Sequence, residues 1–287
     1  MRGRSLLTMT WRDVLFAHWP VPPAVVESRL PAGLAVDTYD GKAYLGVVAF
    51  RMDPIKPRYA PFGLTFGECN LRTYVTPADG ADIDADTEGA LDGERSSGSG
   101  PGPGPRPGIY FFNLDASDRL SVTVARRLFG LPYYTATMDI TRRGEEVRFH
   151  SRRTHDGAPP NRFTATYRPT GEPTEAGPGS IDAFLAERYR FYTAGTDTSS
   201  DRGREGNGDS NDDGDRSRDG TRGRGGGEGK FLAVGEIDHD PWRLSSAEAT
   251  IEANTLFESN GFERPGGEPL LHYSRALPVR AGRLRRW

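Results

Sequence analysis

The chain has 287 residues, of which 35% are hydrophobic, and its formal net charge is −3. This length is enough for one large core, the charge excludes the strongly basic balance of nucleic-acid-binding domains, and the single cysteine excludes a disulfide framework or a multi-cysteine zinc site. No apolar run resembles a signal peptide or a membrane span, so we expect a cytoplasmic protein with no membrane or nucleic-acid partner.

Two stretches, 78–106 and 195–229, differ from the rest of the chain in composition. The first ends in alternating glycine and proline, and the second contains no aliphatic or aromatic residue. A segment with nothing to bury cannot offset the entropy lost on ordering. The two stretches carry net charges of −5 and −3, which leaves the remaining chain at +5. We therefore predict a single domain over 1–287, interrupted by two disordered insertions.

Strand patterns dominate the remainder of the chain. Residues 42–51 are apolar on both faces, which predicts a buried strand, and residues 68–76 alternate between an apolar and a polar face. Further strands are expected at 109–114, 133–141, 146–152, 162–168, 230–237 and 270–279.

Helices are few. One is predicted to begin after Ser117 and to end at Gly130, and a second to run over 181–192 with Ser180 as its cap. Residues 246–259 have a weaker helical pattern. Many short strands with two or three isolated helices indicate a mainly β (β-rich α+β) antiparallel barrel or sandwich, and not a βαβ fold.

The polar face of the strand at 68–76 is the first candidate site. It presents Glu68, Asn70, Arg72 and Tyr74 in one row. If this face meets solvent, the row is an ordinary strand surface. If it lines a barrel lumen, the row could bind a carboxylate or carbonyl group and move a proton. The opposite, apolar face belongs to a core in either case.

Two other segments have a structural and a functional interpretation. Tyr133 and Tyr134 follow the predicted helix stop, where they either pack as aromatic residues or direct one hydroxyl group into a cavity. Residues 236–242 form a strand end and turn, unless Glu236 or His239 faces the lumen. The five histidines lack metal-ligand spacing, and no nucleotide-binding motif is present, so we expect neither a metal nor a cofactor.

Five segments together resemble signatures of the YqjF-like family of uncharacterised proteins. They are the segments at 11–22, 68–75, 125–134, 241–244 and 271–275. The similarity covers the core and omits both predicted insertions. The family resembles a branch of the acetoacetate decarboxylase-like superfamily, which implies a mainly antiparallel conical barrel and admits a homo-oligomer.

The decarboxylases of that superfamily form a Schiff base through a lysine that follows a helix end. Arg126, Gly130 and Pro132 of this chain fit the pattern of that helix end, but Tyr133 and Tyr134 stand where the family has two lysines. A phenol cannot form an imine, so the resemblance implies a protein that is not a Schiff-base decarboxylase. Arg127 also replaces a family glutamate.

The resemblance also implies an acidic residue on a central strand. Glu68 is the best match, and Asn70 is the alternative if the alignment shifts by two positions. Three functions remain open: an enzyme for a small keto, enol or carboxylate molecule, a non-catalytic binding module, and a structural protein with a filled barrel. The first two require Glu68, Arg72 and Tyr133 to converge on one cavity. For the enzyme we expect Glu68 and Tyr133 to be catalytic.

Four further side chains of the segments 68–75 and 125–134 are expected to bind the substrate. They are Asn70, Arg72, Tyr134 and Arg126.

Overall fold

The computed structural model describes residues 5–78, 107–196 and 230–286. The two predicted insertions therefore lie almost wholly outside the described residues, and their predicted disorder stays a prediction. Gly195 and Thr196 are described, and they continue a strand, where they pair with Phe231 and Lys230. The main body thus extends two residues into the second predicted insertion.

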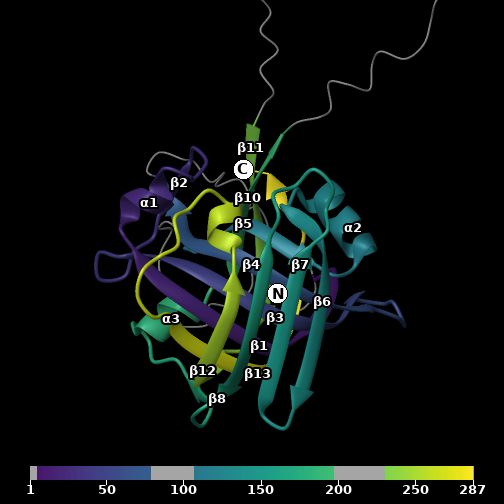
Figure 1. Cartoon of the computed structure of the whole chain (residues 1–287). Helices are drawn as coiled ribbons and strands as arrows, with labels where there is room; N and C mark the ends of the chain where they lie inside the picture. Colours follow the sequence, from purple (N-terminus) through teal and green to yellow (C-terminus); the bar gives the residue numbers. More distant parts are fainter. Residues whose placement is uncertain (1–4, 79–106, 197–229, 287) are drawn as a thin grey trace, which may run out of the picture.

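Nine strands of the described chain close into one ring. In ring order they are β5 (Gly108–Ala116), β6 (Tyr133–Arg143), β7 (Glu146–Arg153), β8 (Arg162–Pro169), β12 (Arg243–Asn254), β13 (Leu270–Ala281), β1 (Leu7–Val21), β3 (Ala43–Pro57) and β4 (Leu64–Pro77). Pairing of β4 with β5 completes the closure. Figure 1 shows β6, β7 and β8 as the near wall of this nine-strand ring.

Two more strands build a second ring on the same sheet. Strand β10 (Arg190–Thr196) pairs with β5, β11 (Lys230–His239) pairs with β10, and β11 also pairs with β13. Strands β10 and β11 therefore close a seven-strand ring with β13, β1, β3, β4 and β5. The two rings share five strands, which form a wall between them.

The shared wall explains the sequence of β3, which is apolar on both faces. Residues 43–50 are all buried, because one face packs into each ring. Side chains such as Leu45 on β3 and Phe149 on β7 fill the nine-strand ring, whereas Val48 and Phe50 on β3 face the seven-strand ring. A strand that is buried on both faces shows a continuous apolar run.

The remaining elements are short. They are the strands β2 (Leu34–Val36), β9 (Thr174–Glu175) and β14 (Arg285–Arg286), and the helices α1 (Pro23–Glu27), α2 (Arg119–Phe129), α3 (Ile181–Ala186) and α4 (Leu256–Ser259). The prediction of a mainly β barrel with few helices is confirmed. Its pairing is mixed, because β5 runs parallel to both β6 and β10, and α2 makes the β5–β6 connection a βαβ unit.

Two helix predictions need correction at their ends. Helix α2 is capped by Asp118, whose carboxylate accepts a hydrogen bond from the Ser121 amide, while Ser117 accepts one from the Gly67 amide instead. Helix α3 does have the predicted Ser180 cap. It ends at Ala186, because the chain then turns into β10 and exchanges helical for sheet hydrogen bonds.

The predicted helix at 246–259 is wrong over most of its length. Residues 246–254 continue β12, which pairs with β8 along its outer half. Ala247, Ala249 and Ile251 pack against the core of the nine-strand ring, while Glu248 is exposed on the other face. Alanine and glutamate favour helices, but propensity is a weak prior that pairing with a neighbouring strand overrides.

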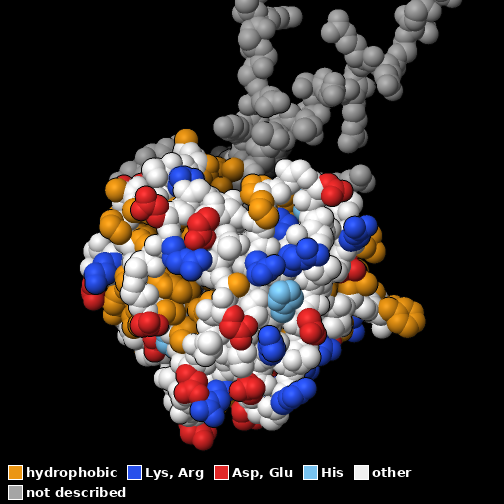
Figure 2. Space-filling view, viewed as in Figure 1, with side chains coloured by type: hydrophobic (Ala, Val, Ile, Leu, Met, Phe, Trp, Pro, Cys, Tyr) orange, Lys and Arg blue, Asp and Glu red, His pale blue; other side chains and the backbone are white. Residues whose placement is uncertain are grey.

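The outer surface carries charges of both signs. In Figure 2, basic and acidic side chains alternate over the face that contains β6, β7 and β8. No helix among the described residues is long and apolar enough to cross a membrane. The expected absence of nucleic-acid and membrane partners stays a prediction.

Candidate functional site

A cavity of about 160 Å³ lies inside the seven-strand ring. All seven strands contribute to its lining, which is mainly apolar. The lining residues whose side chains carry a nitrogen or oxygen atom are Trp11, Glu68, Asn70, Arg72, Tyr133, Arg188, His239 and Trp242. The nine-strand ring, in contrast, is filled by its own side chains. The space for a small molecule therefore lies in the seven-strand ring.

A bulge in β1 brings aromatic residues to this cavity. Asp13 has a φ of 51°, and the pairing of β1 with β3 shifts between Arg12 and Leu15. An extra residue in a strand reverses the alternation beyond it. Trp11 before the bulge and Phe16 after it therefore both face the cavity, although they are an odd number of residues apart. This bulge explains why the sequence of β1 did not show a strand pattern.

Glu68 on β4 is the central ionisable group of the cavity. Its Oε2 accepts a hydrogen bond of 2.7 Å from the Tyr133 hydroxyl, and its Oε1 accepts one of 3.1 Å from the Asn70 amide. Burial raises the pKa of Glu68 to about 7, although both hydrogen bonds and the charge of Arg72 act in the opposite direction. Near neutral pH this carboxyl can therefore either donate or accept a proton.

Asn70 and Arg72 follow Glu68 along the same face of β4. The Arg72 Nη2 donates to the Leu185 carbonyl at 3.2 Å, and its guanidinium lies 5.4 Å from the centre of the Phe16 ring. The Arg72 Nε and the Asn70 Oδ1 are buried and have no hydrogen-bond partner among the described residues. A buried polar group without a partner is costly, so both atoms are suited to contact a ligand.

Tyr74, the fourth residue of the predicted polar row, has a structural role instead. Its hydroxyl lies 2.7 Å from the His18 Nε2 and donates to the Leu185 carbonyl at 2.7 Å. It is not among the residues that line the cavity. The polar row thus faces the interior and not solvent, and its last member attaches β4 to the end of α3.

The two tyrosines after α2 point to different places. Tyr133 lines the cavity and bonds to Glu68. Tyr134 lies outside the cavity lining, with its ring 4.1 Å from the Arg153 guanidinium. Arg126 donates to the Tyr133 backbone carbonyl at 2.7 Å and lines a separate hollow with His155. The structure therefore does not bring Tyr134 and Arg126 to the cavity with the other predicted site residues.

His239, at the end of β11, is the lumen-facing alternative of the segment at 236–242. It is buried and lines the cavity beside Trp242, with 5.7 Å between the two ring centres. Glu236 instead forms ion pairs with Arg190 and Arg285. Trp11 is a cavity residue that the sequence patterns did not reveal. It is the first residue of the family-like segment at 11–22, which was the available signal.

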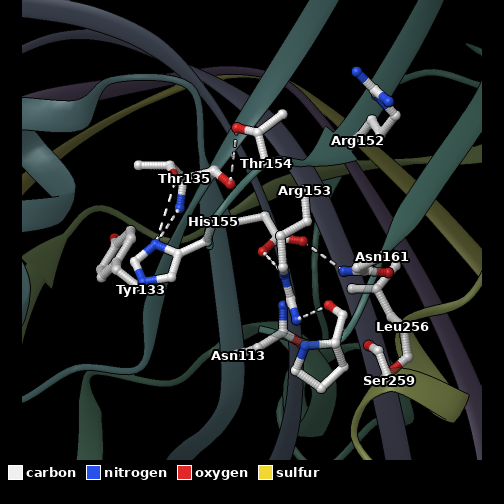
Figure 3. Close-up of polar contacts among 12 residues, drawn as sticks. Asn113, Tyr133, Thr135, Arg152, Arg153, Thr154, His155, Asn161, Leu256 and Ser259 are labelled. Carbon is white, nitrogen blue, oxygen red and sulfur yellow. Dashed lines mark hydrogen bonds and ion pairs between the residues drawn. The ribbon is translucent and has the colours of Figure 1, made fainter. Parts of the chain in front are cut away.

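A second buried polar cluster lies between β5 and β7. The Arg153 Nε donates to the Asp115 Oδ1 at 2.7 Å, and Asn161 donates to the other carboxylate oxygen. Figure 3 shows Arg153 and Asn161 in this cluster. The hydrogen bond from the Thr135 amide to the His155 Nδ1 is separate from it. The Asp115 and Arg153 side chains are each only 2% exposed. Neither lines the cavity, so we assign the cluster to stability.

Two lysine side chains are described, and neither lines the cavity. Lys42 is exposed and Lys56 is half-buried at the far end of β3. The described residues also contain no group of three histidine, cysteine, aspartate or glutamate side chains suited to a metal ion. The expectation that the protein uses no metal or cofactor stays a prediction.

Comparisons with known proteins agree with this architecture. The chain is 33% identical over 288 residues to the uncharacterized protein YqjF of Bacillus subtilis, which covers 99% of this chain and 94% of that protein. An acetoacetate decarboxylase-like enzyme from Sphingomonas wittichii has a similar structure, with a TM-score of 0.54, 15% identity, and coverage of 99% of this chain and 93% of that one.

The enduracididine biosynthesis enzyme MppR, solved in complex with pyruvate, is also similar. Its TM-score is 0.55 at 13% identity, over 100% of this chain and 91% of that one. At these identities the solved structures show a shared fold and no more. The model of the DUF2071 family, described as an uncharacterized conserved protein, matches residues 8–82, 101–203 and 225–278. The chain therefore belongs to the DUF2071 family, as a homologue of YqjF with an acetoacetate decarboxylase-like barrel.

Proposed function

We propose that this protein binds a small keto, enol or carboxylate molecule in the cavity of the seven-strand ring and exchanges a proton with it through Glu68. One observation carries the proposal: a buried carboxyl with a pKa of about 7 lies between Tyr133 and Asn70 on the wall of a mainly apolar cavity. Perturbed carboxyl groups in enclosed cavities are characteristic of sites that transfer protons.

The neighbours of Glu68 supply the other parts of such a site. Among the described residues Arg72 forms no ion pair: its Nη2 donates to the Tyr74 hydroxyl and the Leu185 carbonyl, and its Nε has no partner, so its charge is available to a ligand carboxylate. Arg188, the other arginine of the cavity, is already paired with Asp37 at 2.8 Å. The Tyr133 hydroxyl can turn from Glu68 to a carbonyl oxygen when Glu68 is protonated. These groups would orient a substrate and stabilise a developing enolate.

Non-covalent chemistry is part of the proposal. Tyr133 occupies the cavity position that follows the end of α2, and neither Lys42 nor Lys56 lines the cavity. An imine needs a primary amine that reaches the substrate carbonyl. The proposed chemistry is therefore acid–base catalysis without a Schiff base.

Reduction with borohydride tests this exclusion. We expect no trapped adduct when the full-length protein is treated with acetoacetate or pyruvate and borohydride, as measured by intact-protein mass spectrometry. A stable mass increase that peptide mapping assigns to Lys42, Lys56 or Lys230 would contradict the exclusion. A lysine-dependent decarboxylase, treated in parallel, is the positive control.

Ligand screening tests the function itself. Small keto acids, enols and carboxylates would be ranked by thermal shift, since a ligand that binds the folded state raises its stability, and the hits assayed for turnover or solvent proton exchange. Pyruvate belongs in the set because the similar protein MppR was solved with it. We expect the Glu68→Gln variant to bind the hits and to lose activity by at least about 100-fold, a typical contribution of one acid–base group.

A non-catalytic binding module is the second candidate. Such a module would use the same cavity and the same Arg72. Ligand binding should then depend on Arg72, while neither product formation nor proton exchange is detected. Activity that survives Glu68→Gln would contradict the proposed role of Glu68. The cavity supports both functions over a filled barrel, because Glu68, Arg72 and Tyr133 all line it.

A further inference from the structure

The cavity has a second polar end, formed by His239. The His239 Nδ1 lies 2.8 Å from the backbone carbonyl oxygen of Asp240. A carbonyl oxygen only accepts hydrogen bonds, so Nδ1 carries the proton and, in the neutral ring, Nε2 has a free lone pair. That Nε2 is buried and has no partner among the described residues. His239 therefore offers the cavity a hydrogen-bond acceptor.

This acceptor lies across the lumen from Glu68. In the seven-strand ring, β11 is separated from β4 by β5 and β10 on one side and by β13, β1 and β3 on the other. The ring of His239 is held in place by Tyr189, whose stacked ring centre is 4.5 Å away. A ligand bound at Glu68 and Arg72 would therefore present its far end to a fixed acceptor.

An aromatic wall connects the two ends. Trp242 stacks on Trp11 with 5.8 Å between ring centres and meets the edge of Phe16 at 4.9 Å. Trp11 in turn lies 5.3 Å from Phe50, which is the cross-strand neighbour of Glu68. A flat unsaturated body packs well against such a wall. The Trp11 Nε1 is buried and has no hydrogen-bond partner in the described part of the chain, so a donor is also available beside this wall.

We infer that the ligand of this cavity is a planar aromatic or conjugated molecule with a carboxylate or carbonyl group at one end and a hydroxyl group at the other. The first group meets Arg72 and Glu68, the flat body lies along Trp11 and Trp242, and the hydroxyl donates to the His239 Nε2. The inference rests on the proposed function, because it takes the Glu68 end as the site of the carboxylate or carbonyl group.

Three matched carboxylates test it: 3-(4-hydroxyphenyl)propionate, 3-phenylpropionate and 3-(4-methoxyphenyl)propionate. Their dissociation constants would be measured by calorimetry on the full-length protein. We expect the hydroxyl compound to bind about fivefold more tightly than the unsubstituted one, as one net hydrogen bond provides. The methoxy compound cannot donate, and we expect no such gain for it.

Variants assign the preference to His239. His239→Phe keeps a flat ring but removes the acceptor, and we expect the hydroxyl preference to fall to one or below, because an unpaired hydroxyl would then be buried. His239→Gln retains an acceptor and should keep part of the preference. His150→Phe, at a half-buried position on the outer face of β7, is the matched control and should keep all of it.

Each result decides the inference. The inference is overturned if the wild type shows no preference for the hydroxyl compound, or if a folded His239→Phe variant keeps that preference unchanged. Failure of all three compounds to bind would also overturn it. The proposed function fails separately, if Arg72→Met and Glu68→Gln leave both the binding of small keto acids and their turnover unchanged.

Discussion

At pH 8, the free energy of unfolding of the Glu68→Gln variant is expected to exceed that of the wild type by about 3 kcal/mol. Near pH 4.5, the unfolding free energies of the two proteins are expected to converge. The pKa of Glu68 is about 7 in the folded protein, against 4.5 for the ordinary side chain. Urea unfolding of both proteins at several pH values would measure the difference.

The sign of this effect follows from proton binding. Between pH 4.5 and 7, the folded state retains the proton of Glu68 that the unfolded state has lost, so raising the pH favours unfolding. The stability that the protonated carboxyl provides is fully present below pH 4.5 and lost above about pH 7. Glutamine cannot ionise, and its amide can bond to both Tyr133 and Asn70.

An exposed glutamate provides the matched control. Glu172 lies on a surface loop, and Glu172→Gln should follow the pH profile of the wild type. A constant difference between Glu68→Gln and the wild type from pH 4.5 to 8 would contradict the shifted pKa and remove the main support for acid–base catalysis. A stability cost at one buried carboxyl is typical of groups that are retained for function.

The Asp115→Asn variant is expected to lose about 3–5 kcal/mol of unfolding free energy, because it leaves the Arg153 cation buried without its counterion. The Arg153 side chain is 2% exposed, and its Nη2 already lacks a partner among the described residues. Denaturant unfolding at neutral pH would measure the loss. Glu248→Gln, which removes the exposed partner of Arg168, should cost less than about 1 kcal/mol.

A double substitution separates the ion pair from the packing around it. Asp115→Leu with Arg153→Met removes both charges, and we expect it to be more stable than Asp115→Asn. An Asp115→Asn variant as stable as the wild type would contradict the view that the cluster is a closed, water-excluded ion pair. Turnover per folded molecule should be unchanged, because neither residue lines the cavity.

Local pattern was sufficient for most strands and for the grouping of the site residues on β4. The alternation of residues 68–76 correctly placed Glu68, Asn70 and Arg72 on one face, because successive side chains of a strand point to opposite sides. The continuous apolar run at 42–51 correctly indicated a strand buried on both faces. The sequence placed Tyr133 just after a helix end because Gly130 predicts a helix C-cap. Gly130 does cap α2, with a φ of 58°.

The errors have a common cause in long-range pairing. Residues 246–254 join β12 because β8 offers hydrogen bonds to it, and no local signal reports that neighbour. Strand β1 was not predicted, because the bulge at Asp13 interrupts its alternation. Asp13 adopts its positive φ where the Tyr273 hydroxyl, far along the chain, donates to its carboxylate at 2.7 Å.

The sequence by itself therefore determined the fold class and the polar face of β4. Only the tertiary structure decided that this face lines a cavity inside the barrel, and which distant residues share that cavity. Trp11 and His239 meet Glu68 there because β1, β4 and β11 belong to one closed ring. Ring closure is a property of strand pairings between distant segments, and local residue patterns carry no record of those pairings.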